Sequence, residues 1–260
     1  MDATRTVLLI RHGDTHGYFD DVGLTERGEA QAREKGKELA ARLPAGARVV
    51  MPHAPTARGT ATAVTLRATL LAELGPHTDV EVGELVPDSR FDSVQFLYEG
   101  AARETSGVAA DRLRLRSADP EDTDRDTRPD WARAYDRFDS DYGAGSKLGG
   151  PIDRWMVATT LFFEPPQVIA YRAWGGIRAL EPGTIAVVSS HSALLRGFAA
   201  AAIGHDPGEP ANLEHVEVVT RDDRATLTFR EHVVEVDVPR VVPPWIDPAY
   251  LAGGREGSPW

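Results

Sequence analysis

Two histidines in this sequence each follow a short apolar run that ends in polar residues. His12 comes directly after Arg11, at the end of the first run, and His191 comes directly after Ser190, at the end of a later one. Such runs are typical of buried parallel strands, and functional groups gather where these strands end. We therefore expect His12 and His191 at one edge of a sheet, where Arg11 and Arg58 can join them.

These side chain types suit phosphoryl chemistry. A phosphoryl group carries charge on three nonbridging oxygens, and guanidinium groups match that geometry and stay charged. A histidine must be neutral to attack phosphorus, and its ring is best held through its other nitrogen, commonly by a backbone carbonyl. Gly13 follows His12 and permits the close backbone approach that this contact needs. The leaving oxygen also needs a proton from a carboxylic acid that keeps it near neutral pH.

The composition excludes several other classes of protein. The chain has 260 residues, of which 42% are hydrophobic and 27% charged, the balance of a soluble globular protein, and we expect one domain over 1–260. It has no cysteine, which excludes disulfides, thiolate metal sites and cysteine nucleophiles. A formal charge of −11 argues against nucleic acid as a partner, and an anionic substrate would then need a local positive pocket.

The chain shows no sign of membrane insertion or export. Its longest apolar stretches, such as 185–188 and 198–203, are far shorter than the roughly 20 residues that span a bilayer. Its first residues carry no apolar run with a small-residue cleavage site. We expect a cytoplasmic protein without membrane partners, and the sequence leaves open whether it forms a homo-oligomer.

The expected elements alternate along the chain in the order that builds an open sheet with helices on both faces. Expected strands are 6–10, 48–51, 184–189, 216–220, 225–229 and 233–236. Expected helices follow the cap Thr25 as far as Leu43 and cover 56–74, 167–180 and 192–203. This order predicts an α/β three-layer sandwich with a mostly parallel central sheet and an antiparallel end.

Residues from about 93 to 165 interrupt this pattern and form an insertion or cap region. The part from 100 to 150 is rich in charge and glycine, and 117–130 is acidic without aliphatic anchors, as in a solvated loop. A plain surface insertion and a cover over the substrate are both open. Six residues at nearly helical spacing are expected in the core: Trp131, Tyr135, Phe138, Trp155, Leu161 and Phe162.

Four segments resemble a known family. The run from Leu8 to Thr15, Leu-Leu-Ile-Arg-His-Gly-Asp-Thr, is similar to the signature of the histidine phosphatase superfamily, the phosphoglycerate mutase-like family. Segments 23–32, 55–63 and 187–196 agree with its later motifs in the same order. The resemblance covers about 5–90 and 165–220, leaves the middle of the chain uncovered, and implies the phosphoglycerate mutase-like fold.

The resemblance also implies roles for the matched residues. His12 becomes the transient phosphohistidine, and Arg11, Arg58 and His191 bind the phosphoryl oxygens. Thr15 is expected to approach the phosphate as well. The family needs no metal ion and no organic cofactor.

Three carboxylates are candidates for the proton donor. The family supplies a glutamate followed four residues later by glycine, whereas here Glu84 is followed at that spacing by Asp88. We choose Glu84 and keep Asp88 and Asp92 as alternatives. His53 is expected to pack near its loop rather than to bind substrate. Asp20 and Asp21 are expected to be solvated loop charges, with repulsion of a highly anionic substrate as the alternative.

Together these features predict a metal-independent phosphatase that hydrolyses a small-molecule phosphate ester through a phosphohistidine intermediate. A phosphomutase of the same family is the first alternative, since it differs only in returning the phosphoryl group to a substrate instead of water. A noncatalytic phosphate-ligand-binding module is the second, because a fold does not fix a function. The intact set of His12, Arg11, Arg58 and His191 counts against it.

Overall fold

The computed structural model describes residues 4–17, 21–77, 79–98, 101–118, 128–133, 135–136, 151–157 and 163–241. Its main sheet has seven strands in the order β3-β2-β6-β1-β7-β8-β9. The strands are β1 (Arg5–Arg11), β2 (Arg48–His53), β3 (Glu81–Pro87), β6 (Thr184–Ser190), β7 (His215–Arg221), β8 (Arg224–Phe229) and β9 (His232–Asp237). Strands β3, β2, β6 and β1 run parallel, and β7 to β9 pair antiparallel beside β1.

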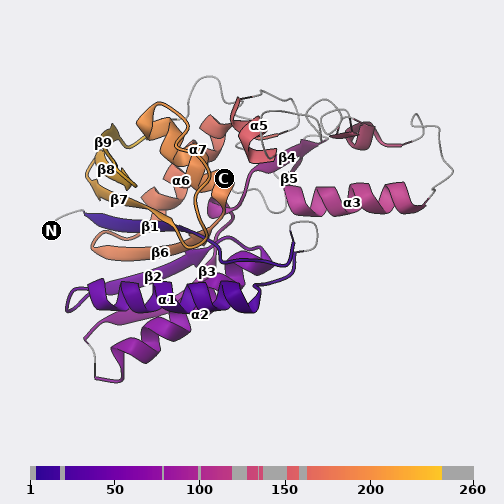
Figure 1. Cartoon of the computed structure of the whole chain (residues 1–260). Helices are drawn as coiled ribbons and strands as arrows, with labels where there is room; N and C mark the ends of the chain where they lie inside the picture. Colours follow the sequence, from indigo (N-terminus) through magenta and orange to yellow (C-terminus); the bar gives the residue numbers. More distant parts are fainter. Residues whose placement is uncertain are drawn as a thin grey trace.

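Helices cover both faces of this sheet (Figure 1). One face carries α1 (Glu26–Arg42) and α2 (Ala57–Leu74), and the other carries α6 (Pro166–Ala179) and α7 (Ser192–Ile203). The three-layer α/β prediction is confirmed. The six strands and four helices expected from the sequence lie within two residues of their observed bounds.

Strand β1 shows why its sequence is an unbroken apolar run. Successive side chains of a strand point to opposite faces, and both faces of β1 are covered. Val7 and Leu9 pack into the core under α6 and α7. Leu8 and Ile10 pack into the second core under α1 and α2. Because β1 is central and buried on both sides, the residues that follow it are held in a fixed position.

Both helices on the second core begin at a threonine cap immediately after a loop from the sheet. The hydroxyl of Thr25 accepts a hydrogen bond from the Gly28 backbone N–H at 3.0 Å. The hydroxyl of Thr56 accepts one from Gly59 at 3.3 Å. These caps satisfy N–H groups that the first helical turn leaves without partners. The Thr56 cap starts α2 with only three residues between the helix and the end of β2, which brings Arg58 to the edge of the sheet.

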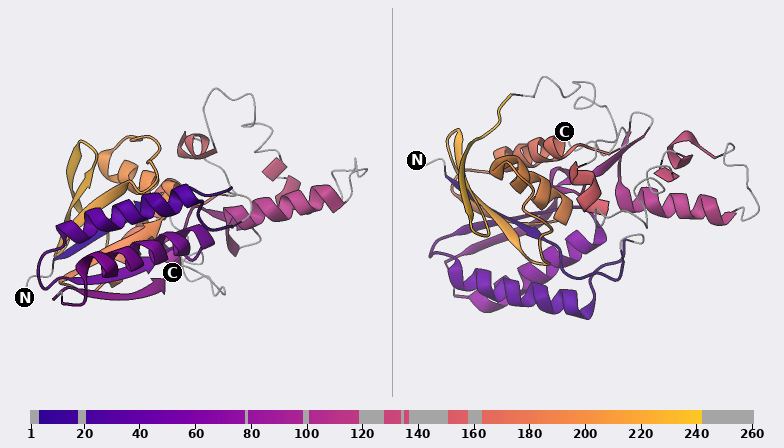
Figure 2. Two further views of the ribbon diagram at one scale, coloured as in Figure 1. Left: turned by 60° about the horizontal axis from the view of Figure 1, so that its bottom comes forward. Right: turned by 45° about the horizontal axis from the view of Figure 1, so that its top comes forward.

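The insertion contains more regular structure than the sequence indicated. It holds the hairpin β4 (Gln95–Tyr98) and β5 (Ala101–Glu104), α3 (Thr105–Ala118) and α5 (Pro151–Val157). In Figures 1 and 2, α3 lies beside this hairpin and extends away from the main sheet. No helix was expected from the sequence at 105–118, and α3 overlaps the expected loop 117–130 only at its last two residues. Most of the loop expected at 117–130 lies outside the described residues.

Aromatic side chains join the insertion to the core under α6 and α7. Trp155 is 5% exposed and belongs to this core, and Trp131 and Tyr135 pack against it. The Phe96 ring lies 5.3 Å from that of Phe163 between ring centroids. The core prediction is confirmed for Trp155 and in part for Trp131 and Tyr135. The other three residues of that prediction, Phe138, Leu161 and Phe162, lie outside the described part of the chain.

Two further elements complete the fold near the site. Strand β3 was absent from the sequence expectation, and the 3-10 turn η1 (Ser89–Phe91) follows it directly.

Among the helices of the described ranges, none is both long enough and apolar enough to cross a membrane.

Candidate active site

Three neighbouring parallel strands bring histidines to one edge of the sheet. Arg11 at the end of β1 pairs with Ser190 at the end of β6, so His12 and His191 leave the sheet side by side. Their ring centroids are 5.2 Å apart, and each residue is 2% exposed. The expected meeting of the two histidines at the carboxyl edge is observed. His53 ends β2 at the same edge.

The backbone and the ring of His12 are both fixed. Its N–H donates to the Ser190 carbonyl at 2.8 Å, and the Asn212 side chain amide donates to the His12 carbonyl at 2.8 Å. Its Nδ1 lies 2.8 Å from the carbonyl oxygen of Gly13. Because a carbonyl oxygen only accepts, the ring proton of neutral His12 belongs on Nδ1, and Nε2 carries the free lone pair.

The surroundings keep His12 uncharged at neutral pH. Burial is the largest cause that lowers the pKa of His12 well below its usual value, followed by the nearby charge of His191. The charges of Arg58 and Arg11 lower it further, although the Gly13 carbonyl opposes them. A neutral imidazole with an available Nε2 is the form that attacks phosphorus.

Close backbone packing positions the loop after His12. A Cβ on Gly28, in the first turn of α1, would lie 2.1 Å from the carbonyl oxygen of Asp14. A Cβ on Gly13 would lie 2.6 Å from the carbonyl oxygen of Gly28. Since both obstacles are backbone atoms, neither position tolerates a side chain without displacing the loop.

Gly28→Ala is therefore expected to destabilise the protein by about 1–3 kcal/mol and to lower kcat, because the loop carrying His12 must move. Urea unfolding and steady-state kinetics measure the two effects. Gly17→Ala in the same loop is the control, since its Cβ would meet nothing within 4 Å. Equal behaviour of the two variants would contradict the close-packing argument.

Both predicted phosphate-binding arginines are buried near the histidines and engaged by carboxylates. Arg58 is 3% exposed, and its two terminal nitrogens lie 3.1 Å from Asp21 and 3.3 Å from Glu104. Arg11 is 9% exposed, donates to the carbonyl of Pro210, and lies 3.1 Å from Glu209. Burial is the main cause that lowers the pKa of His191, and the charges of both arginines lower it further. The four predicted residues thus form one cluster.

Thr15 has a different contact from the one expected. Its hydroxyl donates to the carbonyl of Gly23 at 2.9 Å, with the carbonyl of Val22 at 3.1 Å. Its backbone forms a bridge with Leu24. The Thr15 side chain therefore ties down the loop before α1 in this structure, and its single hydroxyl proton is already used there.

The expected proton donor, Glu84, lies apart from the histidines. Its side chain is 84% exposed and pairs with Arg67 at 2.5 Å. It also comes three residues before Pro87, whose partner His53 ends β2, and so lies roughly 10 Å back from the edge of the sheet. The structure therefore does not bring Glu84 together with the histidines, because it is a solvated carboxylate on an outer strand.

Asp92, an alternative at the sequence level, is the acid that reaches the cluster. It is 6% exposed, and its Oδ1 lies 3.4 Å from Nε2 of His191. Burial raises the pKa of Asp92, with Arg172 as the largest opposing charge. Asp88 instead caps the turn η1 and pairs with Arg90 at 2.7 Å. Burial beside the histidines favours the protonated form of this carboxyl group, which is the form that general acid catalysis needs.

No protein family model and no curated protein matches the chain. Among solved structures, a phosphoglycerate mutase from Bacillus anthracis superposes over 88% of this chain and 93% of its own, with 14% sequence identity and a TM-score of 0.53. The chain has the phosphoglycerate mutase-like fold.

Two further solved structures are similar. A mycobacterial glucosyl-3-phosphoglycerate phosphatase shares 17% identity over 83% of this chain and 90% of its own, with a TM-score of 0.47. A phosphoserine phosphatase from Entamoeba histolytica shares 15% identity over 86% and 95%, with a TM-score of 0.43.

Three further residues contact the cluster, although the sequence did not predict them as site residues. The hydroxyl of Thr56 lies 3.1 Å from Nε2 of His191, although the sequence predicts Thr56 only as the first residue of a helix. Glu104 and Glu209 reach the arginines from the insertion and from the loop before β7. A carboxylate that contacts an arginine from a distant loop leaves no local pattern, so only the fold reveals it.

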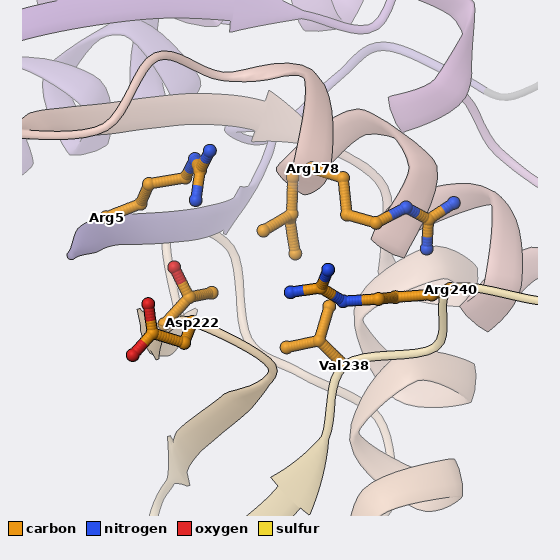
Figure 3. Close-up of a pocket in the computed structure, with 7 residues that line it drawn as sticks. Arg5, Arg178, Asp222, Val238 and Arg240 are labelled. Carbon is orange, nitrogen blue, oxygen red and sulfur yellow. The ribbon is translucent and has the colours of Figure 1, made fainter. Parts of the chain in front are cut away.

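The structure also has a cavity of about 230 Å³ at the start of β1, far from the histidines (Figure 3). Arg5, Arg178, Asp222 and Arg240 are among its lining residues. The guanidinium of Arg178 points away from that of Arg5, so the arginines do not converge on one position.

In the described residues, no group of three or more histidine or acidic side chains is arranged to hold a metal ion.

Proposed function

We propose that this protein is a phosphatase that hydrolyses a small-molecule phosphate ester through a phosphohistidine on His12. The observation that carries the proposal is the His12 ring, buried and neutral, with Nδ1 on the Gly13 carbonyl and its centroid 5.2 Å from that of His191. Two buried arginine charges act on the same ring. This set meets the needs of a nucleophile that attacks an anionic centre.

In the first step, Nε2 of His12 forms a bond to phosphorus while the bond from phosphorus to the ester oxygen breaks. Arg11, Arg58 and His191 bind the nonbridging oxygens and stabilise the charge of the transition state. Asp92 gives its proton to the leaving oxygen, so that an alcohol departs. A bound phosphate dianion also favours protonation of His191, because its negative charge stabilises the imidazolium form.

In the second step, water attacks the phosphohistidine. The Asp92 carboxylate takes a proton from this water as the new bond to phosphorus forms. The bond from phosphorus to Nε2 breaks, inorganic phosphate leaves, and His12 returns to its neutral form. Every proton is thus returned within the cycle, and the scheme uses only side chains of this chain.

The test is rapid-quench trapping of the protein during turnover of an aryl phosphate in EDTA. The expected result is phosphate on the protein that is labile in acid and stable in base, at a level that follows the rate of product release. Turnover without any such phosphate would refute the phosphohistidine scheme. A labelled protein that returns its phosphoryl group to an added alcohol faster than to water would indicate a phosphomutase.

Asp21 occupies part of the proposed phosphate position and is expected to weaken anion binding. Its carboxylate accepts from the backbone N–H of Ala57 at 2.6 Å as well as contacting Arg58. A phosphate must displace it from both donors. Asp21→Asn is therefore expected to lower the inhibition constant of inorganic phosphate about 2–5-fold, the range of an ion pair that is partly exposed.

The control for this prediction is Glu84→Gln, which removes the same charge from an exposed position beside Arg67. It is expected to leave the inhibition constant unchanged. The same decrease in both variants would mean that overall charge, rather than competition for Arg58, controls anion binding.

A further inference from the structure

The side chain of Arg172 on α6 is fully buried, and its charge lowers the pKa of His191. Its relative exposure is 0%, as is that of its ion-pair partner Glu164. The Arg172 Nε donates to one carboxylate oxygen of Glu164 at 3.0 Å, and Nη2 donates to the other at 2.9 Å. Because charges are costly to bury, a pair in the core calls for a specific reason.

The rest of the Arg172 guanidinium binds the chain around Asp92. Nη1 and Nη2 together donate to four backbone carbonyls of one short segment, at distances between 2.8 and 3.1 Å. These carbonyls belong to Ser89, Arg90, Asp92 and Ser93. A buried carbonyl needs a donor, and in a turn it has no neighbouring strand to supply one. Arg172 supplies these donors from another element.

Glu164 anchors the same arrangement from the other side. Its backbone N–H donates to the carbonyl of Gln95 at 2.8 Å, and its carboxylate accepts from the Gln95 N–H at 3.2 Å. Its own carbonyl accepts from the indole N–H of Trp155 at 2.8 Å. The segment carrying Asp92 is therefore held by Arg172 along its length and by Glu164 just beyond it.

The turn also closes onto strand β6. The hydroxyl of Ser190 donates to the carbonyl of Phe91 at 2.5 Å, directly beside His191. A Cβ on Gly176 of α6 would lie 2.4 Å from the ring of Phe91, so the turn packs tightly between α6 and the sheet. A small displacement of this turn would carry the Asp92 carboxyl away from His191.

We propose that Arg172 is a positioning residue for the proton donor, because its guanidinium holds turn 89–93 in the path that brings Asp92 to His191. This inference rests on the function proposed above, in which Asp92 protonates the leaving oxygen. Arg172 acts through Asp92 and does not contact the substrate. The planar fork is essential, because one ammonium group cannot serve four carbonyls and a carboxylate together.

The test is Arg172→Lys, which keeps the charge and removes the fork. With an alkyl phosphate, whose leaving group needs a proton, kcat is expected to fall about 10–100-fold, as for a displaced catalytic group. With 4-nitrophenyl phosphate, whose leaving group needs no strong acid, kcat is expected to fall less than about 3-fold. KM is expected to stay unchanged for both, since Arg11, Arg58 and His191 are intact.

Arg112→Lys is the matched control. Arg112 is also a buried arginine, 8% exposed, in an ion pair with Asp136 at 2.5 Å, but it belongs to α3 in the insertion rather than to α6. Its replacement is expected to leave the ratio of the two kcat values unchanged. Equal losses for both substrates in Arg172→Lys would overturn the proposal and assign Arg172 a purely structural role.

Hydrogen exchange provides a readout independent of activity. Arg172→Lys is expected to speed amide exchange over 89–95 while β1 and β6 keep their protection. Unchanged exchange over 89–95 would overturn the proposal even if the enzyme were inactive. If the lysine variant does not fold, the double variant Arg172→Met with Glu164→Met removes the buried pair together, and the same split between substrates is expected.

A wild-type protein that shows no turnover and no phosphoprotein would refute the proposed phosphatase function but not the fixed turn. An active wild type with equal losses in Arg172→Lys would refute only the positioning role. The two failures are thus distinguishable.

Discussion

His12→Ala is expected to lower kcat by more than about 10⁴-fold and to abolish labelling of the protein by substrate phosphate. General acid or base contributions alone reach about 10²–10⁴-fold, and loss of the nucleophile removes the whole pathway. The fold is expected to persist, because the β1 strand before His12 is buried in two cores that the substitution leaves intact. Steady-state kinetics, rapid-quench labelling and circular dichroism measure the three outcomes.

His53→Ala is the matched control for this prediction. His53 is 4% exposed, ends β2 at the same edge of the sheet, and places its Nδ1 2.9 Å from the carbonyl of Ala54, as His12 does with Gly13. In the described structure it forms no contact with His191. It is expected to retain labelling and most of its activity. Appreciable hydrolysis by pure His12→Ala protein would remove His12 as the nucleophile.

The sequence could predict the histidine pair because each histidine depends on a local pattern. An apolar run long enough for one buried strand ends at His12, and a second ends at His191. Parallel strands that alternate with helices end at one edge of the sheet, so both histidines were expected there, and the pairing of β1 with β6 in the structure puts them side by side. Arg58 was predictable for the same reason, since Thr56 caps a helix directly after β2.

The proposed acid, Asp92, could be predicted only as an alternative, because its position depends on residues far away in the sequence. Asp92 lies beyond a short 3-10 turn, and Arg172, which binds its carbonyl, follows it by 80 positions. No local spacing records that contact. Glu84 fits the sequence spacing better, yet it belongs to a strand that begins too early to bring it to the edge of the sheet.

The elements missed by sequence reasoning share a physical cause. Strand β3 is at the edge of the sheet, with Val86 56% exposed and Gly83 in its middle, so it lacks the alternation of a half-buried strand. Helix α3 contains Gly107 and exposes Leu113 and Leu115, so its apolar residues do not form one stripe. Tertiary contacts, rather than local pattern, determine these two elements.

Asp92→Asn is expected to lower kcat for an alkyl phosphate by about 10²–10⁴-fold while changing it little for 4-nitrophenyl phosphate. An asparagine can keep the hydrogen bond from the Ser93 N–H, 2.7 Å from Oδ1 in the wild type, but it has no acidic proton to give. Glu84→Gln and Asp88→Asn remove carboxylates that do not contact the histidines. Equal losses for both substrates would mean that Asp92 is not the acid.

The pH profile for the alkyl phosphate gives an independent check of the same role. His12 attacks in its neutral form, so the rate rises with pH through its lowered pKa, on the acidic side of 6.5. Asp92 acts in its protonated form, so the rate falls as pH rises through its raised pKa, above 3.8. The alkaline limb is therefore expected to disappear in Asp92→Asn while the acidic limb remains. If the alkaline limb survives in that variant, another group must supply the proton, because asparagine does not titrate.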